Sequence, residues 1–222
     1  TNVGGQRAAF VNGGYIYTAG GCTGTAGIGC STYLTTVQRS SLINATTGDP
    51  GAWSTANQLQ LATGRAIMGA VFYGGFIYLA GGSDSGAPSG GDPGGGAQRR
   101  TVLYAKVDSS NNIVDQDGET VVDNIWTQTT GSMVKERRRT AAFAANGYIY
   151  VLSGHTNDND EDDVTADAEG AADDETYTSV EYAKINPATG DIASFALNST
   201  TITGRWNGAV TFHDGIAHIT GG

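Results

Sequence analysis

Basic residues are scarce in this chain of 222 residues, which has 12 Lys and Arg against 22 Asp and Glu and a formal net charge of −10. Proteins that bind nucleic acid through phosphate contacts present a basic surface, so this balance argues against that class of function. Long apolar runs are missing too, since none approaches the roughly 20 residues of a membrane-spanning helix. We therefore expect neither a nucleic-acid partner nor membrane insertion of this segment.

The sequence also lacks a signal segment and the common catalytic motifs. The chain begins at Thr1 without a basic and apolar signal segment, so we expect a processed or excised part of a longer protein. It has no Gly-x-Ser-x-Gly elbow, no Walker-type phosphate loop and no His-Glu-x-x-His pair. The three histidines, His155, His213 and His218, do not form a convincing copper or zinc set. Enzyme activity of this segment is therefore not the favoured expectation.

Glycine, by contrast, is abundant at 34 residues, and it marks an internal repeat rather than a collagen period. Four segments share an apolar patch, a turn, an aromatic–apolar alternation and a closing pair of small residues: 8–21, 69–82, 141–154 and 208–222. The alternation has the two-residue period of a strand, and turns such as Asn146-Gly147 supply the positive φ of a tight hairpin. Each segment is predicted to form the first and second strands of a repeat.

A second conserved stretch follows the hairpin in three of the repeats. Its copies are residues 101–108, residues 179–195 and, more weakly, residues 37–53. They predict a third and a fourth strand, joined by a Thr-Gly-Asp turn or by a longer loop. A four-stranded meander cannot bury both of its faces alone, so neighbouring sheets must stack. The expected fold class is all-β, with four-stranded antiparallel sheets arranged radially as a β-propeller.

The repeats resemble the kelch family. The resemblance is carried by the closing pairs, such as Gly20-Gly21, the Gly-Tyr-Ile-Tyr before a closing pair, a tyrosine on the third strand, and an aromatic residue on the fourth: Trp53, Trp126 and Phe195. The third-strand variant is similar to kelch-like repeats of bacterial and archaeal cell-surface proteins. The resemblance implies propeller blades whose first strand is innermost.

About three and a half kelch-like blades are expected along the chain. Their boundaries are 7–64, 65–136 and 137–204, with the start of a fourth blade at 205–222. Kelch propellers usually have six or seven blades, so the resemblance also implies a longer chain.

Antiparallel alternation places the loops between second and third strands at one edge, together with the connections to the next repeat. Because the long and unusual segments all lie there, this edge is the expected working face. The first of these loops contains Cys22 and Cys30, which we expect to form a disulfide typical of a secreted protein. Two buried, reduced thiols are the alternative.

Arginines precede the first strand of every repeat and would lie at the same edge: Arg7, Arg65, Arg137, Arg138, Arg139 and Arg205. One interpretation is a ring of guanidinium groups that binds carboxylate or sulfate groups of a ligand or partner. The other is a structural arginine that bonds the backbone between neighbouring sheets, which one arginine in every repeat would also produce.

An acidic loop carries the whole net charge, because residues 156–176 contain ten carboxylates and no Lys or Arg. The spacing of four of them suggests a weak calcium site: Asp158, Asp160, Asp162 and Glu169. A calcium loop needs Gly at its sixth position, where Asp163 stands, so a solvated loop is the alternative. Asn44 and Asn198 match N-glycosylation acceptors, a pattern that also arises by chance.

These observations predict an extracellular or cell-surface module with a structural, adhesive or assembly function. Its partners would be proteins, surface glycans or other copies of the chain, and no cofactor is expected apart from calcium. The alternative is a carbohydrate-active or copper-oxidase-like kelch enzyme whose catalytic residues lie outside this segment.

Overall fold

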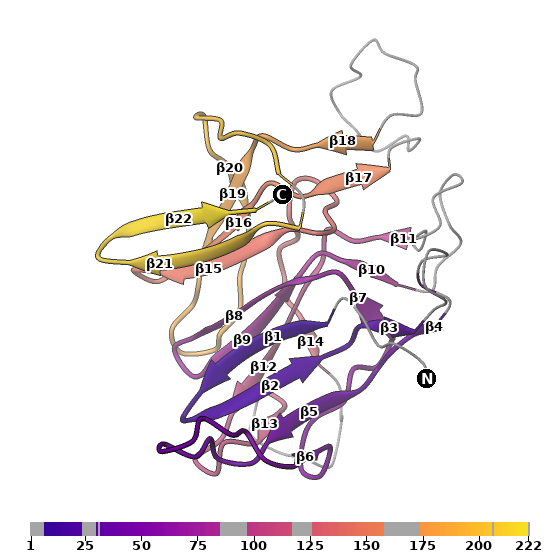
Figure 1. Cartoon of the computed structure of the whole chain (residues 1–222). Coiled ribbons are helices and arrows are strands. Elements are labelled where there is room, and N and C mark those ends of the chain that lie inside the picture. Colours follow the sequence, from indigo (N-terminus) through magenta and orange to yellow (C-terminus); the bar gives the residue numbers. More distant parts are fainter. Residues whose placement is uncertain are drawn as a thin grey trace.

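The computed structural model describes residues 7–23, 30, 32–84, 97–116, 126–157, 174–205 and 207–221 (Figure 1). Every regular element of this part of the chain is a β-strand, and the strands form several antiparallel sheets. The all-β class is therefore confirmed. No helix that could cross a membrane occurs in the ranges described.

Each of the first three repeats forms one sheet whose strands follow one another in space as they do in sequence. The first sheet consists of β1 (Ala8–Asn12), β2 (Tyr15–Ala19), β5 (Val37–Ser40) and β6 (Trp53–Ser54). The second consists of β8 (Gly69–Tyr73), β9 (Phe76–Ala80) and β12 (Val102–Val107), and β12 pairs with both β13 (Ile113–Val114) and β14 (Thr127–Gln128).

The third sheet consists of β15 (Ala141–Ala145), β16 (Tyr148–Leu152), β19 (Val180–Lys184) and β20 (Ala196–Leu197). The fourth repeat contributes only β21 (Ala209–His213) and β22 (Ile216–Thr220). The strand order expected from the repeats is therefore present in the first three sheets, and the fourth contains the expected first hairpin.

Two-residue turns close the hairpins between first and second strands. Gly13 and Gly14 have φ values of 57° and 80°, and Asn146 and Gly147 have 53° and 81°. Positive φ at both central residues matches the right-handed twist of the flanking strands. The turn chemistry of the sequence therefore sets the register of each hairpin, such as Phe10 opposite Tyr17.

The sheets stack in series through their first strands. Strand β1 contacts β8, β8 contacts β15, and β15 contacts β21. One apolar cluster lies between the first and second sheets, where Tyr17 packs with Ile77 and Leu79. A second cluster lies between the second and third sheets, where Tyr78 packs with Ile149 and Val151. Each sheet thus buries the face that it cannot cover by itself.

Short two-stranded ribbons continue the pairing beyond the closing pairs, where the sequence predicted only loops. They are β3 (Cys22–Thr23) with β4 (Thr32–Tyr33), β10 (Ser83–Asp84) with β11 (Ala97–Gln98), and β17 (His155–Asn157) with β18 (Asp174–Thr176). The two arms of each loop leave neighbouring strands side by side, so their backbone groups can go on pairing.

Candidate functional site at the loop-bearing edge

The three ribbons lie at one edge of the sheets, together with the segments that lead into the next repeat. In Figure 1 the ribbons β3–β4, β10–β11 and β17–β18 project on the same side of the molecule. Strand β10 pairs with β7 (Arg65–Ala66), which precedes the second sheet, and His155 of β17 bridges Arg138. We call this the loop-bearing edge. Strand alternation predicted that the loops between second and third strands lie at the same edge as the connections to the next repeat, and the structure confirms this.

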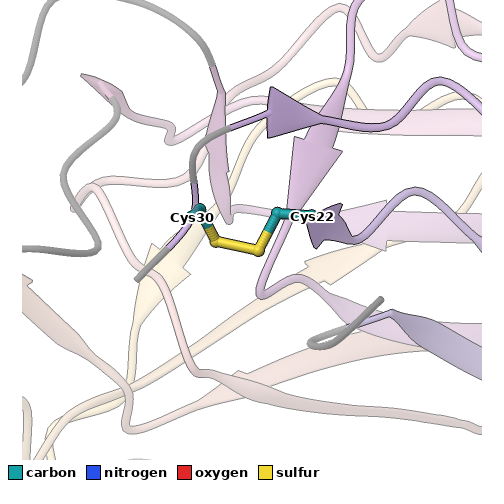
Figure 2. Close-up of a disulfide and its surroundings, with 2 residues drawn as sticks. All are labelled: Cys22 and Cys30. Carbon is teal, nitrogen blue, oxygen red and sulfur yellow. A yellow bond between two sulfur atoms is a disulfide. The ribbon is translucent and has the colours of Figure 1, made fainter. Parts of the chain in front are cut away.

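The cysteines of the first ribbon form the expected disulfide (Figure 2). Cys22 and Cys30 are joined across a Cα–Cα distance of 5.4 Å, and Cys22 lies opposite Tyr33 in the ribbon. Cys22 also packs in a small buried cluster with Ala66 and Ile67. The disulfide therefore closes its own loop and fixes that loop against the start of the second repeat.

Three of the predicted arginines bond the backbone of their own repeat. Each donates from Nη1 to the carbonyl oxygen of the residue 16 positions later, the first member of the closing pair. The pairs are Arg65 with Gly81 at 3.5 Å, Arg137 with Ser153 at 2.6 Å and Arg205 with Gly221 at 2.8 Å. The bond thus recurs in three successive repeats.

The same arginines also join neighbouring sheets through their backbone. Their carbonyl oxygens accept hydrogen bonds from the second member of the preceding closing pair: Gly21 to Arg65 at 2.8 Å, Gly82 to Arg137 at 2.7 Å and Gly154 to Arg205 at 2.9 Å. Gly20 must be glycine here, since a Cβ would lie 2.1 Å from the Arg65 oxygen. This arrangement supports the structural alternative for the three arginines, and a ligand-binding role stays a prediction.

Arg137 makes the densest set of contacts at this edge. Its side chain is fully buried, and Nε donates to Oε1 of Glu181 at 2.9 Å. Nη2 donates to the Ser179 hydroxyl at 2.6 Å, and the guanidinium lies 4.7 Å from the Tyr177 ring centroid. Glu181 also accepts the backbone N–H of Lys135 at 3.0 Å. A buried charge pair needs such additional hydrogen bonds to offset the loss of solvation.

Arg138 is buried as well, and its Nη2 lies 2.9 Å from His155 Nε2. Because a guanidinium only donates hydrogen bonds, Nε2 accepts and the proton of the neutral imidazole lies on Nδ1. Arg7 differs from the others, since Nη1 donates to Gln38 Oε1 at 3.3 Å.

A feature that the sequence did not predict is a residue with positive φ two positions before the first strand of the second, third and fourth repeats. Ile67, Arg139 and Asn207 have φ values of 65°, 55° and 61°. Arg139 donates its N–H to the Ile67 carbonyl at 2.9 Å, and Asn207 donates to the Arg139 carbonyl at 3.1 Å. Each of these residues stands two positions after one of the three arginines described above, and this equal spacing was visible in the sequence. The residue types gave little indication of a positive φ, because of Ile, Arg and Asn only Asn adopts it readily.

Burial also changes the pKa of Arg65. Burial of the Arg65 side chain lowers the pKa of its guanidinium to about 10, although the nearby Asp84 carboxylate opposes that change. Asp84 itself forms an ion pair with Arg99, whose Nε lies 2.6 Å from Oδ2. The hydrogen bond to Asp84 raises the pKa of Arg99, so Arg99 stays charged. The two neighbouring arginines therefore differ, since burial lowers the pKa of Arg65.

The remaining predicted residues are the four acidic residues of the weak calcium site and the two glycosylation acceptors. Asp158, Asp160, Asp162 and Glu169 lie outside the described residues, and within them no group of three or more His, Cys, Asp or Glu could bind a metal ion. Asn44 and Asn198 are exposed, and each accepts the backbone N–H of the residue two positions later, Thr46 at 2.8 Å and Thr200 at 3.3 Å. Glycosylation of either asparagine stays a prediction.

The sequence of the chain matches no protein-family model and no curated protein.

Proposed function

We propose that the chain is part of a kelch-like β-propeller that acts as a binding or assembly module outside the cell, with the loop-bearing edge as its interaction face. The propeller is supported by the stacking of three sheets of one strand order through β1, β8 and β15, with β21 next in the series. Radial stacking through the first strands is the principle of that architecture. The Cys22–Cys30 disulfide supports an oxidising compartment.

The observation that carries the binding role is the difference between the two edges of the sheets. At one edge, two-residue turns such as Gly74-Gly75 join the first and second strands. At the loop-bearing edge, the connecting segments differ in length and composition from repeat to repeat, and a disulfide closes one of them. A repeated scaffold that carries variable loops on one edge is the usual design of a binding protein.

Two basic groups at this edge, the exposed Arg100 and the half-buried Lys135, indicate the chemistry of the partner. Arg100 is the second residue after β11, and its carbonyl accepts the N–H of Met133 at 2.8 Å, which places it near Lys135. Lys135 extends over the Tyr177 ring at 4.9 Å. These groups suit a carboxylate- or sulfate-bearing glycan or an acidic protein surface.

A pair of double variants tests this function. Arg100→Ala with Lys135→Ala removes two positive charges from the loop-bearing edge, and Lys106→Ala with Lys184→Ala removes two near the opposite turns. Binding to arrayed sulfated and carboxylated glycans should fall at least tenfold in the first variant and little in the second. Equal losses in both variants would show non-specific attraction and would contradict the proposal.

A further inference from the structure

The two cysteines of the disulfide differ in their burial. Cys22 is 6% exposed and packs in a buried cluster with Ala66 and Ile67. Cys30 is half-buried and packs against the border of that cluster. A molecule that approaches the disulfide from solvent therefore meets Cys30 before it can reach Cys22.

The position of Cys22 does not depend on the sulfur bond alone. Cys22 lies in β3 opposite Tyr33 of β4. The preceding residue, Gly21, donates its N–H to the Arg65 carbonyl at 2.8 Å, and its own carbonyl accepts the N–H of Leu34 at 2.8 Å. These backbone contacts hold Cys22 against the second repeat, so we expect it to stay there when the disulfide opens.

The residues that shield Cys22 are themselves fixed. Ala66 lies in β7, which pairs with β10 and places Ala66 opposite Ser83. The Ile67 carbonyl accepts the N–H of Arg139 at 2.9 Å. The shield therefore belongs to the second repeat and is anchored by the third, rather than by the loop that the disulfide closes.

Thiol–disulfide exchange needs access to one sulfur and release of the other. An attacking thiolate bonds to one sulfur of the disulfide, and the second sulfur departs as a thiolate. Attack on Cys30 releases Cys22 into apolar surroundings, which disfavour a charged sulfur. The released Cys22 also stays close, because the two Cα atoms are 5.4 Å apart and backbone contacts hold β3 in place. Cys22 is therefore placed to attack Cys30 again and to re-form the bond.

We propose that Cys30 is the site at which small thiols and disulfides of the glutathione class modify this protein, and that Cys22 is the shielded thiol that removes the modification. In the forward step the thiolate of the small thiol bonds to the Cys30 sulfur, the Cys22–Cys30 bond breaks, and the Cys22 sulfur takes a proton from water. In the return step Cys22 loses that proton, bonds to Cys30 and expels the small thiol as a thiolate. Each step exchanges one disulfide for another, so no net oxidation occurs.

The test uses the 222-residue protein with one cysteine replaced. Cys22→Ala leaves the Cys30 thiol, and Cys30→Ala leaves the Cys22 thiol. Each variant is incubated with oxidised glutathione, whose S–S bond the protein thiolate breaks, so that one glutathione joins the protein and the other leaves reduced. Mass spectrometry measures the rate of this reaction. In the folded proteins Cys30 should react at least about tenfold faster than Cys22, and in urea the two rates should be equal.

Two glycine variants in the Cys30→Ala background test the shield. Ile67→Gly removes a side chain that packs on Cys22, and glycine readily adopts the φ of 65° at this position. This variant should react severalfold faster with oxidised glutathione than its Cys30→Ala background. Asn207→Gly makes the equivalent change in the fourth repeat, where φ is 61°, and should leave the rate unchanged. Circular dichroism checks that both variants are folded.

Four results would overturn the proposal. Equal rates for Cys22 and Cys30 in the folded proteins would show that burial gives no selectivity. The absence of an adduct on Cys30 in the Cys22→Ala variant would exclude Cys30 as a modification site. Equal rates for the Ile67→Gly and Asn207→Gly variants would exclude the shield. The reduced parent treated with oxidised glutathione should regain the Cys22–Cys30 disulfide, and a lasting adduct on Cys30 would rule out the role of Cys22.

Discussion

The carboxylate of Glu181 lies 2.9 Å from Nε of Arg137, and neither side chain has any solvent exposure. The two residues are 44 positions apart, and they meet because Arg137 precedes the first strand of the third sheet while Glu181 lies in β19. In the second sheet, Leu103 replaces the glutamate, and Asp84 lies opposite Arg65 instead. The two recurring arginines therefore differ: Arg137 forms a buried ion pair with Glu181, whereas Arg65 lies near Asp84, whose ion pair is with Arg99.

Replacing Glu181 with leucine should destabilise the protein strongly. Glu181→Leu leaves Arg137 buried without its carboxylate, and the loss of one partner of a buried pair costs about 3–5 kcal/mol. Urea unfolding should show a lower midpoint by the corresponding amount. Arg137→Met in the Glu181→Leu background should recover part of the loss, because no charge is then buried. A loss below about 1 kcal/mol in the single variant would contradict the importance of this pair.

Reduction of the Cys22–Cys30 disulfide should lower stability moderately. The bond closes a loop with a sequence separation of 8 residues, and loop entropy for so short a loop amounts to about 2–3 kcal/mol. Thermal unfolding with and without reductant measures this loss, and a Cys22→Ala, Cys30→Ala variant without reductant provides the control. If the reduced parent and the variant both melt at the temperature of the oxidised parent, the disulfide does not stabilise the fold.

Stability should fall when the pH rises above 10. Burial raises the pKa of Tyr17 and of Tyr78, whose ordinary value is 10.0. Above pH 10 the unfolded chain loses these phenolic protons first, so the folded state binds more protons and the free energy of unfolding decreases. Arg65 acts in the opposite direction, since its pKa is lowered to about 10.

The variant Tyr78→Phe separates these contributions. It removes one of the raised phenols and the hydrogen bond to Gly190, so it should be less stable than the parent at pH 8. Between pH 9 and pH 11, however, its urea midpoint should fall less steeply than that of the parent. A parallel fall of both proteins would rule out Tyr78 as a source of the alkaline loss.

Two substitutions of Ser153 should differ in their effect. Ser153 has a φ of 52°, where the first two repeats have Gly20 and Gly81. Its hydroxyl accepts the backbone N–H of Arg205 and donates its one proton to the carbonyl of Tyr177 or of Arg205, both within hydrogen-bond distance. Ser153→Ala removes these bonds and keeps the unfavourable φ, so it should cost about 1–3 kcal/mol. Ser153→Gly loses the same bonds but relieves the backbone, so its cost should be smaller by about 1 kcal/mol. Chemical unfolding of both variants tests the order, and a less stable glycine variant would contradict it.

Much of the fold was predictable because its signals are local. The two-residue alternation of segments such as 69–82 and the turn dipeptides predicted the hairpins, and strand alternation predicted which loops share an edge. The pairing of Cys22 with Cys30 followed from their proximity in one loop. The ribbons beyond the closing pairs were not predicted, since two-residue strands such as β10 have too few residues to show a period.

By itself, then, the amino-acid sequence determined the all-β class, the repeats, the hairpin turns and the position of the variable loops, because each depends on residues close together in the chain. Only the tertiary structure decided what the buried side chains do. Tyr78 meets a carbonyl 112 residues away, and Arg137 meets Glu181, only after neighbouring sheets have stacked. A ligand-binding role of Arg65 and Arg205 stays a prediction, whereas the same stacking brings their backbone carbonyls against Gly21 and Gly154 of the preceding sheets.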